Sequence, residues 1–149
     1  MKLRALYRVR FRYLDSWRVD LQGPLGSERS MFLLAQGHCE GRISGSFHGS
    51  NFPRRRVDRQ FLPEFTGAID TDDGATILCE YRGFGRPEPP GGREVVLTAT
   101  HLSDHPRYQF LNDAVCVGAG EVRADDAGEP RASTTIVIDI AELVWEALT

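Results

Sequence analysis

The sequence predicts an all-β fold, a closed or nearly closed antiparallel β-barrel of about 7–9 strands. Three observations lead to this prediction. Apolar and polar residues alternate with a period of two along most segments, turn signals built on glycine and proline recur at short intervals, and no long segment has the spacing of an amphipathic helix. Glycines inside strand-like segments would supply the curvature that closure of a barrel requires.

Size and charge favour a single cytoplasmic domain over residues 1–149. The net charge is −3 and the sequence pI is about 5.8, so no overall basic field attracts nucleic acid or an anionic membrane. The chain has no apolar run near the roughly 20 residues that cross a bilayer. Its first residues alternate charge with apolar side chains, unlike a signal peptide.

The first strand is predicted from residues 2–12, where apolar side chains occupy every second position and mostly lysine or arginine lies between them. Residues 15–28 are predicted to form a loop because they contain Gly23-Pro24. A second β region follows over 29–47. Its repeated glycines, among them Gly37, are typical of bulges or sharp bends in a strand.

The middle of the chain predicts one hairpin and two loops. Residues 51–59 are irregular and basic, and 61–70 resume the alternation of a strand. Asp73-Gly74 then predicts a tight turn, since glycine accepts the positive φ of such turns, with 75–81 as the return strand. Prolines and glycines over 83–93 predict a loop.

The last third predicts three more strands. Residues 94–102 and 114–122 are β-like, and one helical turn over 108–112 lies between them. Residues 123–131 predict a hairpin connection, and 134–140 are β-branched at nearly every position. Residues 141–148 fit either a strand or a short helix.

Several motifs, in order across residues 29–142, resemble a bacterial and fungal family called domain of unknown function 3237. The matching strings are Gly37-His38-Cys39-Glu40-Gly41, Thr71-Asp72-Asp73-Gly74-Ala75-Thr76-Ile77, Tyr81-Arg82-Gly83, Pro106-Arg107-Tyr108-Gln109-Phe110-Leu111-Asn112 and Val117-Gly118-Ala119-Gly120-Glu121. The resemblance implies a small barrel, similar in shape to lipocalins and allene oxide cyclase and often oligomeric. It implies no established general activity.

This chain departs from the family pattern at three places. Residues 50–56 lack the family's usual Asp-Trp pair, so no role of that tryptophan is carried over. His101 stands where the family more often has phenylalanine, and Phe110 replaces a common tryptophan.

The residue pattern does not indicate a metal site, a cofactor site or a catalytic nucleophile. His38 and Glu40 share a strand face, but the closely spaced histidine pair of a cupin-type metal site is absent, so we expect no metal and no cofactor. Cys39, Cys79 and Cys116 lie far apart in apolar segments and are predicted to be buried structural thiols. No serine follows the Gly-x-Ser-x-Gly pattern of a nucleophile elbow.

The basic segment from Arg54 to Arg59 has aromatic neighbours, Phe52 and Phe61, as surfaces that bind single-stranded nucleic acid do. The acidic balance of the whole chain opposes that function. A loop that grips an acidic ligand, or a simply solvated segment, fits the sequence better.

A small barrel can hold one ligand among a few polar side chains on an apolar wall. His101 shares a strand face with Leu97 and Ala99, so we expect its ring to point inward. The candidates for proton transfer are His101, Glu40 and Tyr108. The candidates for ligand contact are His38, Glu80, Arg82 and Asn112. Each of these residues also has a structural explanation, such as a capped turn or an exposed pair.

Three functions remain open from the sequence. The first is an enzyme that isomerises, cyclises or hydrates a small organic metabolite by acid–base chemistry. The second is a non-catalytic, lipocalin-like carrier, and the third is an interaction or scaffold protein with a filled barrel. We also expect a homo-oligomer, a dimer, because residues 140–148 carry much apolar surface, including Trp145.

Overall fold

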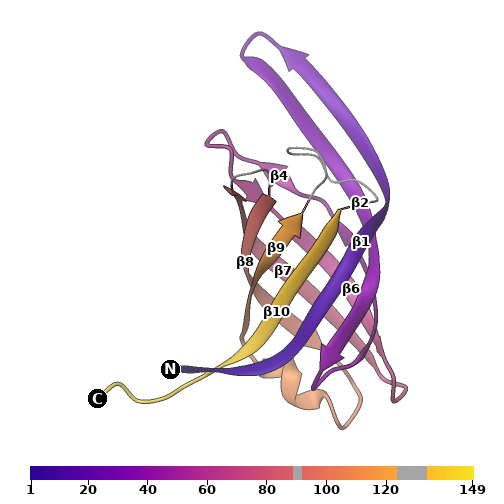
Figure 1. Cartoon of the computed structure of the whole chain (residues 1–149), viewed down its shortest axis with the longest axis vertical. Helices are drawn as coiled ribbons and strands as arrows, with labels where there is room; N and C mark the ends of the chain where they lie inside the picture. The colour runs from indigo at the N-terminus through magenta and orange to yellow at the C-terminus, as the bar shows by residue number, and fades with distance from the viewer. Residues whose placement is uncertain (89–91, 124–133) are drawn as a thin grey trace.

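The predicted barrel is present, and it is closed. The computed structural model describes residues 1–88, 92–123 and 134–149, and in them eight strands form a ring in the order β7-β6-β3-β2-β1-β10-β9-β8, with β7 pairing to β8 (Figure 1). All pairings between neighbouring strands are antiparallel. The ring strands are β1 (Lys2–Gly23), β2 (Gly26–Gly41), β3 (Gly45–Asn51), β6 (Glu64–Thr71), β7 (Thr76–Glu88), β8 (Gly92–Leu102), β9 (Cys116–Arg123) and β10 (Thr135–Val144).

Two further strands, β4 (Arg54–Arg55) and β5 (Phe61–Leu62), pair with each other and extend the β3–β6 hairpin beyond the ring. The basic segment predicted to be irregular therefore contains one short strand. We call the end of the barrel that carries β4 and the β1–β2 tip the upper end. The lower end carries the chain termini and the 3₁₀ helix η1 (Gln109–Asp113) (Figure 1).

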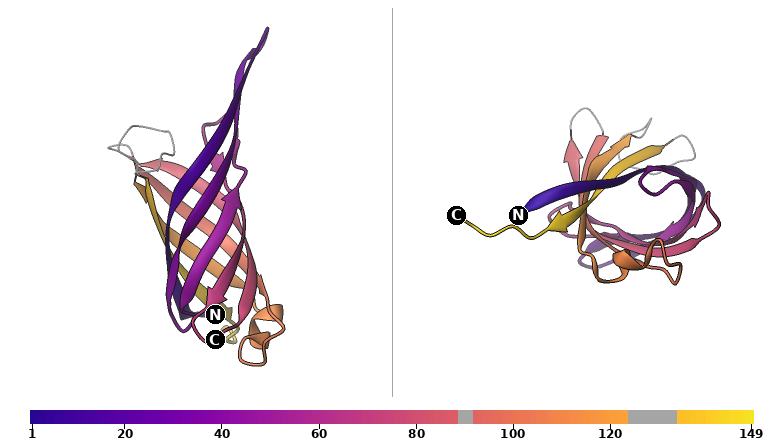
Figure 2. Two further views of the ribbon diagram at one scale, coloured as in Figure 1. Left: turned by 90° about the vertical axis from the view of Figure 1, so that its right-hand side faces the viewer. Right: turned by 90° about the horizontal axis from the view of Figure 1, so that it is seen from below.

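The predicted loop over 15–28 is wrong. β1 and β2 stay paired from Tyr7↔Gly41 to Gly23↔Gly26, so the hairpin continues well past the barrel and projects from its upper end (Figure 2, left). Gly26, with φ of 128°, makes the reversal possible. The register shifts between Tyr13 and Asp15, where the inward-facing part of β1 ends. The sequence therefore indicated the turn correctly but not its short length.

The predicted loop over 83–93 is also mostly strand. β7 reaches Glu88 and β8 begins at Gly92, and their pairing runs to Glu88↔Gly92. Pro87 remains in the strand because one edge of β7 has no ladder partner in this region of the described chain. The hairpin connection predicted over 123–131 falls almost entirely outside the described residues.

The remaining predicted elements are close to the observed ones. Gly74 has the positive φ, 89°, that the turn between β6 and β7 requires. The helical turn is η1, one residue later than predicted. β10 continues to Val144, so residues 141–144 are strand, whereas residues 145–149 are neither strand nor helix and extend away from the barrel (Figure 1).

The inner face of the ring forms the core. Aromatic rings fill its middle: Phe11 packs against Phe47 and Phe65 with ring centroids 5.2 and 5.3 Å apart, and Phe47 stacks on Tyr81 at 6.1 Å. Branched aliphatic residues of β10, β6 and β7 complete the wall: Ile136, Ile138, Ile140, Ile69 and Ile77. Burial of this apolar surface is the main force that stabilises the barrel.

Two glycines show how closely the neighbouring backbones approach. A Cβ atom at Gly37 would overlap the carbonyl oxygen of Arg10 and lie 2.6 Å from the Cα of Phe11. A Cβ atom at Gly120 would likewise overlap the carbonyl oxygen of Val137. These positions permit the strong bending that a closed eight-stranded ring needs.

The two ends of the barrel differ in exposure. At the lower end, Leu111 of η1 is fully buried, and η1 contacts β8. At the upper end, the inner-face residues Phe61, Arg93 and Val122 are only partly buried. Among the described residues, no helix has both the length and the apolar character of a membrane span.

Candidate functional site

Three polar side chains meet inside the barrel near its lower end. The Tyr7 hydroxyl lies 2.7 Å from Nε2 of His101 and 2.6 Å from the Tyr81 hydroxyl. All three residues are at most 5% exposed. The Tyr7 and His101 rings meet edge to face, with centroids 5.7 Å apart. The prediction that His101 faces inward is therefore confirmed.

Strand geometry brings these residues together from distant parts of the chain. His101 lies on β8 and Tyr81 on the neighbouring β7, whereas β1, which carries Tyr7, is separated from β8 by β10 and β9. A register shift on β1 between Ala5 and Tyr7 makes both Leu6 and Tyr7 point inward. The same bulge leaves Leu3 and Ala5 exposed, although the alternation placed them on the inner face.

Burial keeps this cluster uncharged at neutral pH. It lowers the pKa of His101 to about 4, so the imidazole is neutral. Burial also raises the pKa of Tyr7 and of Tyr81 well above that of a free phenol, and neighbouring thiols, Cys79 first, raise the Tyr7 pKa further. The three groups therefore share protons through hydrogen bonds without a net charge.

One atom of the cluster lacks a partner. Nδ1 of His101 is buried and makes no hydrogen bond with the described part of the chain. A neutral imidazole donates from one nitrogen and accepts at the other, so Nδ1 is either an unused donor or an unused acceptor. A buried polar atom without a partner costs about 1–3 kcal/mol, and a bound polar group would recover that free energy.

Three thiols line the same interior, as predicted for buried structural cysteines. Cys79 lies opposite His101 in the ladder between β7 and β8, Cys39 opposite Val9, and Cys116 opposite Ala99. All three are free. Burial raises the pKa of Cys39 and of Cys79 to about 12 and that of Cys116 to about 11, so they stay protonated and are poor nucleophiles.

Four other sequence candidates face outward and do not join the cluster. His38 and Glu40 are exposed on β2, where the Glu40 carboxylate lies 3.4 Å from Nε of Arg10. Glu80 and Arg82 are exposed on β7, and Arg82 forms an ion pair with Glu64 at 3.2 Å. The pairs do share strand faces, as predicted, but alternation alone could not tell the outer face from the inner one.

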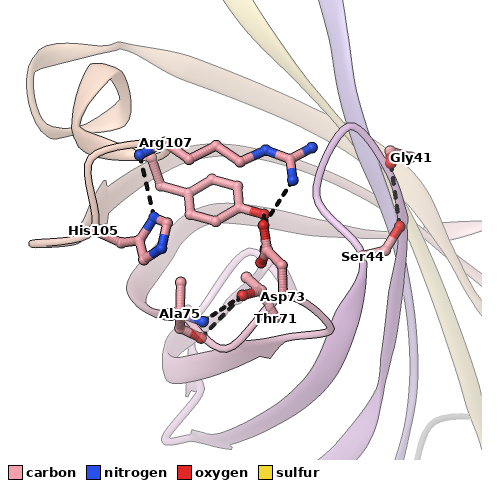
Figure 3. A network of polar contacts seen from close by, with 8 residues as sticks. Gly41, Ser44, Thr71, Asp73, Ala75, His105 and Arg107 are labelled. Atoms are coloured by element: carbon pink, nitrogen blue, oxygen red, sulfur yellow. Dashed lines mark hydrogen bonds and ion pairs between the residues drawn. The ribbon is translucent and has the colours of Figure 1, made fainter.

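Tyr108 and Asn112 hold the lower end of the barrel together. The Tyr108 hydroxyl donates to the Asp73 carboxylate at 2.9 Å. Nη1 of Arg107 lies 2.7 Å from the same carboxylate (Figure 3). The Asn112 amide accepts from the Ser103 backbone N–H at 2.8 Å and donates to the Ser103 carbonyl at 2.9 Å. These bonds fix η1 and its loop to the β6–β7 turn and to the end of β8.

Two residues of the cluster, Tyr7 and Tyr81, were not among the sequence candidates. The usable signal was position: both tyrosines occupy inward positions in apolar strands, and a buried phenol needs a hydrogen-bond partner. Among the described residues, no group of three or more His, Cys, Asp or Glu side chains could hold a metal ion.

Comparison with sequence families gives one match over nearly the whole chain. A family model described as a protein of unknown function, DUF3237, matches residues 1–143. No curated protein sequence matches this chain.

Among the solved structures with this architecture are proteins from bacteria and from a fungus. A β-barrel-like protein from Acinetobacter baumannii has a TM-score of 0.74 and 17% identity, over 95% of this chain and 94% of that chain. A protein with unknown function from Clostridium acetobutylicum has a TM-score of 0.78 and 15% identity, over 97% and 100%. A structure described as an enzyme from Penicillium herquei has a TM-score of 0.60 and 17% identity, over 93% of both chains.

Proposed function

The chain belongs to the DUF3237 family of proteins of unknown function, and from the geometry of its barrel we propose that it is an enzyme that binds a small organic molecule inside the barrel and exchanges protons with it. Isomerisation, cyclisation and hydration are the reactions that such chemistry serves. His101, Tyr7 and Tyr81 are the residues that would carry it.

The observation that carries the proposal is the unpartnered Nδ1 of His101. Its other nitrogen is already bonded to Tyr7, which is bonded in turn to Tyr81. A core histidine that served packing alone would have both nitrogens satisfied or would be replaced by an apolar ring. An inward polar atom left free inside an apolar wall is the arrangement expected of a ligand-binding barrel.

The imidazole can act as acid and base at once. With Nδ1 protonated, His101 donates that proton to a substrate while Nε2 takes a proton from the Tyr7 hydroxyl. With Nε2 protonated and bonded to the Tyr7 oxygen, Nδ1 is the free acceptor and takes a proton from one atom of the substrate, and the imidazolium that forms returns a proton to another atom of the same molecule. Tyr81 stabilises the Tyr7 oxygen in either direction through the 2.6 Å bond. A pKa of about 4 makes the neutral, proton-accepting imidazole dominant at pH 7.

The description of one structural neighbour, from Penicillium herquei, as an enzyme agrees with a catalytic use of this barrel. That description belongs to the fungal protein. It adds to the proposal only that the architecture is compatible with catalysis.

The test is a comparison of metabolite consumption by three proteins. The wild type, His101→Phe and the outward-facing control His38→Gln are each incubated with a small-molecule extract, which is then compared by liquid chromatography coupled to mass spectrometry, because isomers have the same mass and must be separated first. We expect the wild type and His38→Gln to deplete the same compound and His101→Phe to leave it intact. A compound that is bound and recovered unchanged by all three would make the protein a carrier instead.

A second candidate function is favoured by the projecting β1–β2 hairpin. One of its faces is apolar and exposed, with Trp17 packed on Phe32 at a centroid distance of 5.7 Å and Phe32 beside Phe52 at 6.3 Å. Exposed apolar faces of this kind are typical of protein interaction surfaces. Consumption of no compound, together with stable self-association, would favour an interaction protein.

A further inference from the structure

Arg93 is a cation on the inner wall of the barrel. It lies on β8 two residues above Val95, and β8 side chains at this spacing point inward from Val95 to His101. Its guanidinium lies over the Phe61 ring, 4.4 Å from the ring centroid. Phe61 faces inward as well, because it pairs with Gly85 and packs against it. Both side chains lie at the upper rim.

The charge of Arg93 has no counter-charge within the described part of the chain. Arg93 makes no hydrogen bond and no ion pair there, and its Nη1 is buried without a partner. Burial lowers the pKa of Arg93, and the nearby positive charge of Arg55 lowers it further. A half-buried guanidinium with no anion is an unfavourable arrangement, which a bound anion would relieve.

Arg55 adds a second cation to the same rim. It pairs directly with Phe61 across the β4–β5 ladder, so the two side chains lie on one face. The arginines on the outer surface of this region differ from these two. Arg54 is within 3.3 Å of Glu64, and Arg86 is within 3.8 Å of Glu94. Arg54 and Arg86 are thus paired, whereas Arg93 has no ion pair among the residues that the structure describes.

We propose that the upper rim binds an organic anion with a flat apolar body, its acid group between Arg93 and Arg55 and its body against Phe61. A guanidinium suits a carboxylate or sulfonate because its planar fork donates two parallel hydrogen bonds. The Phe61 ring offers an apolar face beside those donors. This part of the inner wall is accessible, because its side chains are only partly buried: Phe61, Arg93 and Val122.

This site is separate from the one around His101. Arg93 and His101 lie eight residues apart on β8, which corresponds to about 26 Å at roughly 3.3 Å per residue. The packed rings of Phe11, Phe47 and Phe65 occupy the barrel between the two levels. The anion site can therefore be tested independently of the proton-transfer function.

Two fluorescent probes with the same ring system test the site. One is 1-anilinonaphthalene-8-sulfonate, an anion, and the other is N-phenyl-1-naphthylamine, which lacks the sulfonate. We expect Arg93→Met to weaken binding of the anionic probe about tenfold or more and to leave the neutral probe unchanged, since the apolar part of the side chain is kept. Arg93→Lys should retain part of the preference for the anion.

Arg86→Met on the outer face of the adjacent strand is the matched control and should bind both probes as the wild type does. His101→Phe should also leave both affinities unchanged, which separates this site from the proposed catalytic one. Equal weakening of both probes by Arg93→Met, unchanged binding of the anionic probe by that variant, or no binding of it by the wild type would each overturn the proposal. Circular dichroism would establish that every variant is folded.

Discussion

At the scale of single residues, the molecule keeps three polar side chains in its core where apolar ones would fit. The chain of bonds from Tyr81 through Tyr7 to His101 satisfies three of its four hydrogen-bonding groups and leaves Nδ1 of His101 without a partner among the described residues. Half-satisfied polar groups in a core reduce stability, so their presence there indicates a use other than packing.

His101 should make the stability of the protein depend on pH between about 6.5 and 4. The unfolded chain binds a proton at His101 near pH 6.5, whereas the folded chain does so near pH 4, so the unfolded state holds more protons in this window. The free energy of unfolding therefore falls as the pH decreases, by about 3 kcal/mol in total. Denaturation by urea at several pH values measures this fall.

His101→Phe supplies the comparison, because a phenylalanine of similar size cannot take up a proton. Its stability should change much less over the same window. Asp73 and Asp139, whose carboxylate pKa values are lowered by hydrogen bonds, lose their contributions below pH 3.8 in both proteins. If the free energy of unfolding fell equally in the two proteins between pH 6.5 and 4, the result would contradict the buried, neutral state of His101.

The bonds within the cluster should be strongly coupled. Tyr7→Phe removes the central hydroxyl and leaves the Tyr81 hydroxyl and Nε2 of His101 without partners, so we expect a loss of about 3 kcal/mol. Tyr81→Phe removes only one bond. When Tyr7→Phe is already present, Tyr81→Phe should lower the free energy of unfolding much less than it does in the wild type. Chemical denaturation of the three variants checks this, and additive losses would argue against a shared network.

The sequence allowed prediction of His101 but not of the cluster around it. Alternation along 94–102 was enough to place His101 among Leu97 and Ala99, because that strand has no bulge. Tyr7 meets His101 and Tyr81 only because the ring closes, and a contact across a barrel has no signal in local spacing. Glu40 was assigned to the pocket because alternation reveals two faces without identifying the buried one.

At the scale of elements, strand length was the property least accessible from the sequence. Residues 15–28 and 83–93 contain turn-forming residues, yet most of them lie in the ladders of β1–β2 and β7–β8. Glycine and proline indicate that a reversal occurs, but ladder hydrogen bonds and cross-strand contacts decide how far the strands run. A short turn signal such as Asp73-Gly74 predicts the position of the turn well, because these two residues suit one specific tight turn.

Replacement of a glycine at a close approach of strands should destabilise the barrel. Gly37→Ala would force a methyl group against the backbone of Arg10 and Phe11, so we expect a loss of about 3 kcal/mol. Gly23→Ala is the matched control, because its nearest neighbouring atom is the carbonyl oxygen of Gly26 at 3.9 Å. Guanidinium denaturation should find the control close to wild type. Equal stability of both variants would show that β1 and β2 can separate at Gly37 without cost.

At the scale of the whole molecule, large apolar side chains are exposed at both ends of the molecule. Trp145 is 79% exposed and Leu148 is 89% exposed on the C-terminal tail, and the β1–β2 hairpin exposes further apolar side chains at the upper end. Surfaces of this kind are normally covered by a partner.

We propose that the partner is a second copy of the chain, as expected from the sequence. Light scattering should give the mass of a dimer, twice 16.7 kDa, at micromolar concentration. Removal of residues 145–149 should shift the mass toward that of one chain if the tail makes the contact, and replacement of Trp17 by serine should do so if the hairpin makes it. A monomeric mass for the intact chain would refute the proposal.

The pairing of β1 with β10 also determines when this protein can fold. β10 is the last of the ring strands in chain order, so β1 gains its second neighbour only after all the other ring strands have been made. At about 5–20 residues per second, β1 waits for its second neighbour for roughly 7–26 seconds of translation. During that time its free edge can pair with other nascent chains. Ring closure therefore requires β10, and synthesis that stops before residue 135 yields an open sheet prone to aggregation.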